Sequence, residues 1–190
     1  GAALAQRGYN VLLIDMDMGL RNMDLYLGME NRVVYNIMDV LSGICRISKA
    51  IIRVDGFSSL YFMAAAPRLD ERDITPLHMA ILCAKLKQVF DYIIIDCPAG
   101  IGEMLEVSLE AADKAVIVTE PEFAASRDAD MTERFLREKG LDDICVVLNR
   151  VNVELMREGF MPDLATVTSS FTSPLVGIIQ EDDNIRISTN

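Results

Sequence analysis

The 190-residue sequence has no tryptophan, a single histidine and four scattered cysteines, none of them in a CxxC pair. The cysteines are therefore predicted to be buried, reduced thiols of a cytosolic protein, with a reactive Cys97 beside Asp96 as the alternative. His78 has no second histidine with which to share a metal. It is predicted to be a surface or hydrogen-bonded residue of a helix rather than a ligand or general base.

Basic residues are also scarce, with 18 Lys and Arg against 29 Asp and Glu and a net charge of -11. This balance argues against non-specific DNA binding and against docking on anionic lipid through this part of the chain. No apolar run exceeds strand length, so neither a signal peptide nor a transmembrane segment is predicted. A hydrophobic content of 51% predicts a large core, and the length predicts one domain over residues 1–190.

Apolar runs alternate along the chain with segments of helical pattern. The expected strands are Val11–Asp15, Leu60–Met63, Tyr92–Asp96, Ala115–Thr119, Ile144–Leu148 and Leu175–Ile179. The expected helices are Gly1–Arg7 (ended by Gly8), Asn22–Leu27, Val34–Leu41, Pro76–Phe90, Glu103–Ala111, Ser126–Gly140 and Pro162–Thr168. Such alternation predicts an α/β fold with a mostly parallel, doubly wound sheet and helices on both faces.

Acidic residues stand where two of these strands end. Asp15 and Asp17 follow the first apolar run, and Asp96 ends a later one. Ligands of open α/β sheets bind at the carboxyl ends of the strands, so the three carboxylates are expected at one sheet edge. That arrangement suits a hard divalent cation and a phosphate ester. A DxD pair alone is a weak signal, because aspartates also cap helices. Asp24 is expected either to cap a helix or to favour its start.

The sequence contains no GxxxxGK[ST] motif and no Gly-Lys pair. In a doubly wound sheet, the first strand is usually central and carries the phosphate loop. Here the chain opens inside a helix instead. Two interpretations are open: the protein never had a phosphate loop, or the sequence is a fragment that starts after it.

Several segments resemble the deviant Walker A (ParA/MinD) family of ATPases, and within it the septum-site-determining branch. The matching segments are GLRNMDL at 19–25, NRVVY at 31–35, DCPAGI at 96–101, TEPE at 119–122, RDAD at 127–130, VLNR at 147–150 and STN at 188–190. The resemblance runs nearly end to end. It implies a P-loop NTPase-like fold whose phosphate-loop strand would precede Gly1, which favours a fragment that is inactive by itself.

The same resemblance implies what the complete protein does. It would hydrolyse ATP with Mg²⁺, form an ATP-dependent homodimer and help to place the division septum. Its partners would be the division-inhibitor and activator proteins of the Min system, with no nucleic acid. It would be cytoplasmic and peripheral on the inner face of the plasma membrane, held there by a C-terminal amphipathic helix that is absent from this sequence.

For the phosphate end of the site, the resemblance implies four roles. Asp17 would orient the attacking water and lie near the metal, and Asp15 would be a supporting catalytic carboxylate. Asp96 would hold a magnesium-bound water. The amide of Gly100 would sense the γ-phosphate, as in loops that are ordered only while that phosphate is present.

For the base end, the resemblance implies that Asn149 reads adenine and that Arg150 and Glu181 also belong to the nucleotide site. Residues 180–182 read Gln-Glu-Asp where the family usually has Pro-Glu-Asp. The pair Asp128 and Asp130 is either a solvated helix start or a surface that contacts a partner.

Three alternatives remain open. The first is a ParA-type partition ATPase or a flagellar-number regulator, which the acidic balance and the GLRN segment disfavour. The second is a phospho-accepting receiver domain, which would be shorter and would carry a lysine where Asn149 and Arg150 stand. The third is a non-catalytic relative that only binds.

Overall fold

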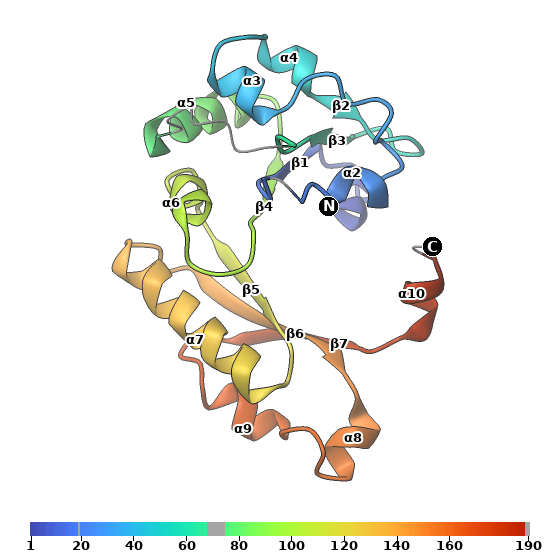
Figure 1. Ribbon diagram of the computed structural model, residues 1–190, viewed down its shortest axis with the longest axis vertical. Coiled ribbons are helices and arrows are strands. Elements are labelled where there is room, and N and C mark those ends of the chain that lie inside the picture. The colour runs from blue at the N-terminus through green and yellow to red at the C-terminus, as the bar shows by residue number, and fades with distance from the viewer. Residues whose placement is uncertain (19, 68–74, 189–190) are drawn as a thin grey trace. The chain divides into compact units, whose positions relative to one another are not determined.

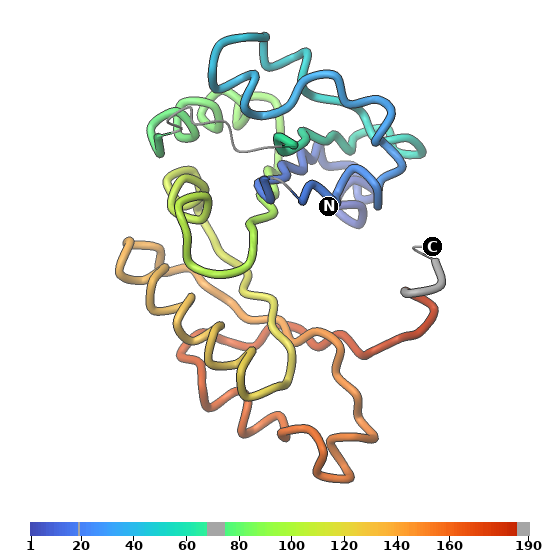
Figure 2. Tube along the Cα trace, viewed as in Figure 1, coloured from blue at the N-terminus to red at the C-terminus, as the bar shows by residue number. Residues whose placement is uncertain are grey.

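The computed structural model describes residues 1–18, 20–67 and 75–188, with side chains to residue 185 (Figures 1 and 2). The chain divides into two compact units, residues 1–111 and 112–190, and each is described by itself. Gly19, Thr189 and Asn190, which belong to the resemblance, lie outside the described residues. In the described part of the chain, no helix is both long enough and apolar enough to cross a membrane. The single ATPase domain over residues 1–190 stays a prediction.

The first unit contains a four-stranded sheet in the order β2-β3-β1-β4 (Figure 1). Its elements are α1 (Ala2–Gln6), β1 (Val11–Asp15), α2 (Met23–Tyr26), α3 (Ile37–Leu41), α4 (Ile47–Ala50), β2 (Ile52–Arg53), β3 (Leu60–Met63), α5 (Pro76–Leu86), β4 (Tyr92–Asp96) and α6 (Glu103–Leu109). Strand β1 pairs in parallel with both β3 and β4, while the short β2 is antiparallel to β3.

Helices cover both faces of this first sheet. Successive side chains of β1 point to opposite faces and therefore pack against different helices. Leu12 and Ile14 belong to a buried cluster with residues of α3, α5 and α6. Val11 belongs to a second cluster with Ala5 of α1, and residues of α2 pack against it. Strand β1 is therefore the buried centre of the unit, and its carboxyl end is held in a fixed place.

The second unit contains a three-stranded parallel sheet in the order β5-β6-β7. Its elements are β5 (Ala115–Thr119), α7 (Phe123–Glu138), β6 (Ile144–Val151), α8 (Val153–Arg157), α9 (Leu164–Thr168), β7 (Leu175–Gln180) and α10 (Asp183–Ser188). Ile117 and Thr119 are buried, and the Thr119 hydroxyl donates to the Ala125 carbonyl oxygen of α7. On the opposite face of β5, Val116 and Val118 are exposed.

The predicted strands are confirmed, and the last two run further than expected: β6 extends to Val151 and β7 to Gln180. The two-residue β2 was missed because it is too short to show an alternating pattern. Helices α4, α8 and α10 were also missed; they have four to six residues each. Helix α3 begins at Ile37 rather than at residue 34, because the Asn36 side chain accepts hydrogen bonds from the Met38 and Asp39 amides and caps it there.

Other helix ends also differ from the sequence pattern. Helix α7 begins three residues early, after Glu122 as its N-cap, and α5 ends at Leu86 rather than Phe90. Gly8 has a φ of +91° and follows α1, as the predicted helix stop requires. His78 Nδ1 accepts a hydrogen bond from the Thr75 amide at 3.3 Å, so the prediction of a hydrogen-bonded histidine is confirmed.

The mostly parallel α/β class is confirmed, but the described residues form two sheets where one was expected. Strand β4 ends the first sheet and β5 begins the second, and within the described ranges no strand pairs with the outer edge of either. Neighbouring strands of one sheet share hydrogen bonds. Among the described residues no strand pairing joins the two sheets, so they are counted as two.

Candidate functional site

The carboxyl edge of the first sheet brings together the acidic residues predicted from the strand ends. Asp15 and Asp96 are direct register partners at the ends of the parallel strands β1 and β4. The Met16 amide donates to the Asp96 carbonyl oxygen at 2.9 Å, which extends the pairing one residue beyond β1. Asp17 follows at once, so all three acids lie at one edge, as predicted.

Asp15 is almost completely buried, with 1% of its surface exposed. Its Oδ1 accepts a hydrogen bond from the Asp17 amide at 2.9 Å, whereas its Oδ2 is buried and has no hydrogen-bond partner among the residues that the structure describes. Burial raises the pKa of Asp15, and the negative charges of Asp96 and Asp17 raise it further, while the nearby amides of Asp17 and Met23 act in the opposite direction. A buried carboxylate with one unsatisfied oxygen is a site that favours a cation or a donor from elsewhere.

Asp96 and Asp17 share this electrostatic environment. Desolvation raises the pKa of Asp96, and the charge of Asp17 adds to it, although the Asp96 residue as a whole is exposed. No group of three or more His, Cys, Asp or Glu residues in the described ranges could hold a metal ion by itself. Mg²⁺ in proteins takes one or two carboxylates and completes its shell with water and phosphate oxygens.

Asp24 has a structural role and is not part of the acidic edge. It is 3% exposed, and Arg21 donates to its Oδ2 through Nε at 2.7 Å and through Nη2 at 2.6 Å. A charge paired in this way is satisfied, which agrees with its exclusion from the predicted catalytic set.

Gly100 and Cys97 lie in the turn that follows β4. Gly100 has a φ of +85°, which favours glycine, and among the described residues its amide donates no hydrogen bond. Its N–H is thus available to an anion. Burial raises the pKa of the Cys97 thiol, a Ser108 hydrogen bond lowers it and the Asp96 charge raises it again. The net shift is upward, so the thiol stays protonated near neutral pH, which disfavours the reactive-thiol alternative.

The three residues predicted for the base end lie together in the second unit. Arg150 Nη1 donates to Glu120 Oε1 at 3.1 Å, and its Nη2 lies 3.7 Å from Glu181 Oε1. The Asn152 side chain donates to the other Glu181 oxygen at 3.5 Å. Asn149 is half-buried, and within the described residues its side chain has no hydrogen-bond partner.

A β-bulge separates these residues from the regular part of β6. Leu148 pairs with Ile178 and Val151 with Gln180, so that Asn149 and Arg150 together face only Ile179 of β7. Arg150 has a φ of +53°, in the left-handed region that non-glycine residues seldom adopt. Bulges of this kind re-aim side chains next to functional sites.

The sequence analysis did not name Glu120 as a site residue. The available signal was its position directly after the strand Ala115–Thr119, the same criterion that found Asp15 and Asp96. The bulge had no such signal in the sequence. Asn149 and Arg150 directly follow the apolar run of β6, and no glycine marks the irregularity.

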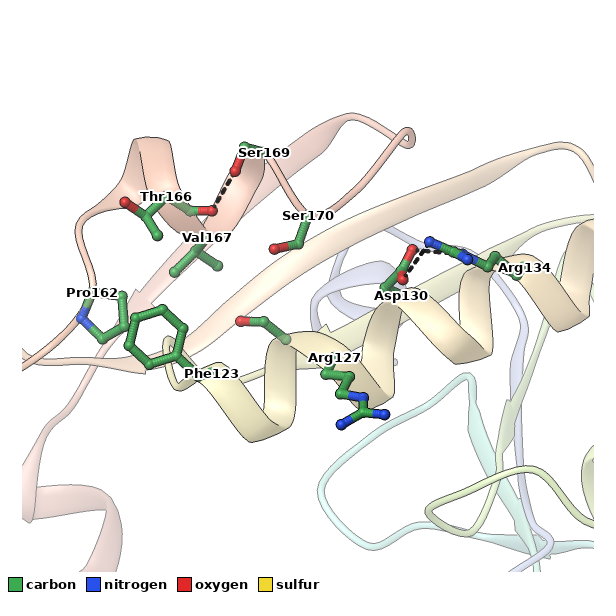
Figure 3. A pocket seen from close by; sticks show the side chains of 10 residues that line it. Phe123, Arg127, Asp130, Arg134, Pro162, Thr166, Val167, Ser169 and Ser170 are labelled. Carbon is green, nitrogen blue, oxygen red and sulfur yellow. Dashed lines mark hydrogen bonds and ion pairs between the residues drawn. The ribbon is translucent and has the colours of Figure 1, made fainter.

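A hollow of about 450 Å³ lies elsewhere in the second unit, between α7 and the α9 region (Figure 3). Asp130 lines it and pairs with Arg134 one turn along α7, at 2.9 Å. Asp128, the other half of the predicted pair, is exposed. None of the residues predicted to bind nucleotide lines this hollow.

Comparisons with known proteins agree with this geometry. A family model described as an AAA domain matches residues 1–135. The chain is 40% identical, over its full length, to the putative septum site-determining protein MinD of Guillardia theta and covers 71% of that protein. A chain of the MinC:MinD cell division protein complex of Aquifex aeolicus superposes with a TM-score of 0.91 at 35% identity, covering all of this chain and 76% of that one.

A third relative was solved with a ligand bound. It is the septum site-determining protein MinD of Pyrococcus horikoshii complexed with Mg-ADP, with a TM-score of 0.83 and 29% identity over 98% of this chain and 75% of that chain. The parallel sheets, the acidic strand ends and the AAA-domain match define an α/β fold of the P-loop NTPase class. Within that class, the chain belongs to the MinD family of septum site-determining proteins.

Proposed function

We propose that this chain is the nucleotide-binding part of an ATPase that binds ATP with Mg²⁺, dimerises on ATP and helps to place the division septum. Family membership supports the septum role. The Mg-ADP bound to the Pyrococcus relative supports the nucleotide and metal, and the MinC:MinD complex of Aquifex supports a division-inhibitor partner. An activator protein and peripheral attachment to the inner face of the plasma membrane complete the proposal.

The observation that carries this proposal is the pairing of Asp15 with Asp96 at the ends of two neighbouring parallel strands. Two carboxylates held side by side repel each other unless a cation or a proton offsets their charge. Asp15 Oδ2 is buried and has no hydrogen-bond partner among the described residues, which supports a cation bound at this edge. The donor set, made of oxygens only, fits Mg²⁺.

Asp96 would hold a magnesium-bound water and Asp17 would lie near the metal, which would supply positive charge against the phosphates. Asp17, two residues beyond the end of β1, would orient the attacking water. Its amide is fixed by Asp15 Oδ1, so that Asp15 supports the placement of Asp17. The free amide of Gly100 would bind a phosphate oxygen.

The base end of the nucleotide would lie against Asn149. Its carboxamide carries both a donor and an acceptor, and the six-membered ring edge of adenine offers the matching pair. Arg150 and Glu181 would complete this end of the site.

The test is a comparison of two variants in the protein as encoded by its gene, including any residues before Gly1 and after Asn190. We expect D17A to lower single-turnover ATP hydrolysis about 100-fold or more while Mg-ATP affinity stays near wild type, because it removes the positioning of water. We expect D96A to weaken Mg²⁺-dependent ATP binding about tenfold or more, because it removes an anchor of the metal.

The matched control is D55N, an exposed carboxylate of the same unit that pairs with Arg32. It should change neither quantity. Equal losses of affinity in D17A and D96A would contradict their separate roles, and unchanged hydrolysis in both would contradict an ATPase site at this edge.

Dimerisation and membrane attachment need their own measurement. With ATP and Mg²⁺, D17A should accumulate as a dimer in light scattering, because nucleotide stays bound but is not hydrolysed. Sedimentation with anionic vesicles should then depend on ATP. Sedimentation with DNA instead of vesicles would favour the partition-type alternative.

A further inference from the structure

The end of β6 combines two features that need support. Arg150 has a left-handed backbone, and Asn149 and Arg150 form a two-against-one bulge opposite Ile179. A left-handed conformation is unfavourable for a residue with a Cβ atom and persists only where its surroundings hold it. The bulge ends the pairing of β6 with β5, whose last pair is Thr119 with Leu148.

The Arg150 side chain is held from both neighbouring strands. Glu120 follows β5 and accepts a hydrogen bond from Arg150 Nη1 at 3.1 Å, and Glu181 follows β7 and lies 3.7 Å from Nη2. Glu181 is itself tied in place, since its amide donates to the Val151 carbonyl oxygen at 3.1 Å and its carboxylate accepts from Asn152. The three charged side chains therefore bridge the carboxyl ends of all three strands of the second sheet.

These ion pairs add little to the stability of the fold. The side chains of Glu120, Arg150 and Glu181 are 37%, 53% and 35% exposed, and exposed pairs contribute weakly because water screens them. What they do determine is geometry: with its guanidinium held on two sides, Arg150 cannot relax to an ordinary strand conformation without breaking both contacts. The residue whose direction depends on this is its neighbour Asn149, whose carboxamide is unpartnered within the described residues.

We propose that Glu120 and Glu181 are positioning residues for base recognition: by clamping Arg150 they keep the bulge that presents Asn149 to the nucleotide base. The inference rests on the proposed function, because it takes the ligand of Asn149 to be adenine. It gives the backbone of Arg150 a role in base recognition. It also makes Glu120 a positioning residue, although the family resemblance had implied no role for Glu120.

The experiment measures the ratio of ATP to GTP affinity in the protein as encoded, by calorimetry, for E120Q/E181Q, R150G, R150G/E120Q/E181Q and wild type. E120Q/E181Q keeps the shape of both side chains but removes their charge, and we expect the ratio to fall roughly five- to tenfold as Arg150 leaves the left-handed region. Glycine adopts that region without strain. In R150G the bulge therefore does not depend on the two glutamates, and adding E120Q/E181Q to R150G should lower its ratio by less than about twofold, whatever R150G itself does to nucleotide affinity.

The matched control is D143N, which removes a carboxylate from an exposed ion pair with Lys114 at the amino end of the same sheet. Its ratio should equal that of wild type. An unchanged ratio in E120Q/E181Q would overturn the proposal. So would a further fall in R150G/E120Q/E181Q as large as the fall in the wild-type background, because the two glutamates would then act on base recognition without Arg150.

A second readout separates this inference from the proposed function. Hydrogen exchange of residues 149–151 without nucleotide should be faster in E120Q/E181Q than in wild type and unchanged in D143N. If the wild-type protein does not bind ATP but exchange behaves as stated, the clamp stands and the nucleotide assignment falls. If exchange at 149–151 is the same in all three proteins, the clamp itself is wrong.

Discussion

Asp15 in the first unit and Glu133 in the second are both almost completely buried carboxylates, and their surroundings treat them in opposite ways. In the first unit, Asp15 is 1% exposed, and within the described part of the chain one of its oxygens has no hydrogen-bond partner. In the second, Glu133 of α7 is 2% exposed and accepts hydrogen bonds from the Thr172 amide and hydroxyl, the Ser173 hydroxyl and Arg137. The surroundings therefore satisfy one charge and leave the other incomplete.

The pKa values follow from this difference. Burial raises the pKa of Asp15, and its neighbouring acids add to the rise. Burial by itself would also raise the pKa of Glu133, but hydrogen bonds from Ser173, Thr172 and Arg137 outweigh it and lower the pKa to about 2. Burial alone does not distinguish a structural carboxylate from a functional one; the number of donors around it does.

Glu133 stabilises the second unit because it joins α7 to the segment just before β7. The largest effect is expected for E133Q, which replaces the charge with an amide among the same donors. A fall in pKa from 4.5 to about 2 corresponds to about 3 kcal/mol of stability at neutral pH, to order of magnitude. Hydrogen exchange of α7 and β7, read by mass spectrometry, would measure the loss.

The pH dependence gives the sign of the same effect. Because the folded pKa of Glu133 is lowered, its contribution is present above the unfolded pKa near 4.5 and is lost as the pH falls toward about 2. E133Q should lack this acid-dependent part of the loss. If wild type and E133Q lose protection of α7 in parallel on acidification, Glu133 is not the group responsible.

The sequence predicted one of these two carboxylates and could not predict the other. Asp15 and Asp96 were found because buried parallel strands are apolar and their ends are therefore visible in the sequence. Glu133 is one acid in an amphipathic helix, and its partners Thr172 and Ser173 lie 39 and 40 residues further on. Nothing local marks such a pair, because only tertiary packing brings them together.

The same reason explains the base end of the site. Asn149 and Arg150 were found from the resemblance, but the bulge that aims them depends on how β6 and β7 pair, with Leu148 opposite Ile178 and Val151 opposite Gln180. The separation into two sheets likewise depends on which strand edges find partners. Periodicity shows where a strand lies, and pairing partners are a property of the whole fold.

Asp15 should show the opposite behaviour to Glu133 when its charge is removed. D15N keeps an acceptor for the Asp17 amide and removes a buried negative charge beside Asp96. We expect it to raise the free energy of unfolding by about 1 kcal/mol at neutral pH, because the folded protein then no longer buries a negative charge beside another one. The proposed function predicts weaker Mg-ATP binding in the same variant.

The pH dependence again gives the sign. Because the folded pKa of Asp15 is raised, its favourable contribution belongs to the protonated form and is lost as the pH rises through that pKa. The advantage of D15N should therefore grow from acid to neutral pH in urea unfolding. A variant less stable than wild type at neutral pH would mean that the Asp15 charge is satisfied in the folded protein.

The smallest effect is expected for D143N, and it tests whether pairing or burial gives Glu133 its importance. Asp143 accepts a hydrogen bond from Lys114 at 2.9 Å, a length within the range of the contacts around Glu133, but both side chains are more than half exposed. Water and salt screen such a pair, so its removal should leave unfolding unchanged within experimental error, at low and high ionic strength alike. A loss as large as that in E133Q would show that pairing, rather than burial with several donors, sets the value of a carboxylate in this protein. The difference between Asp15 and Glu133 would then have to be explained by charge pairing alone.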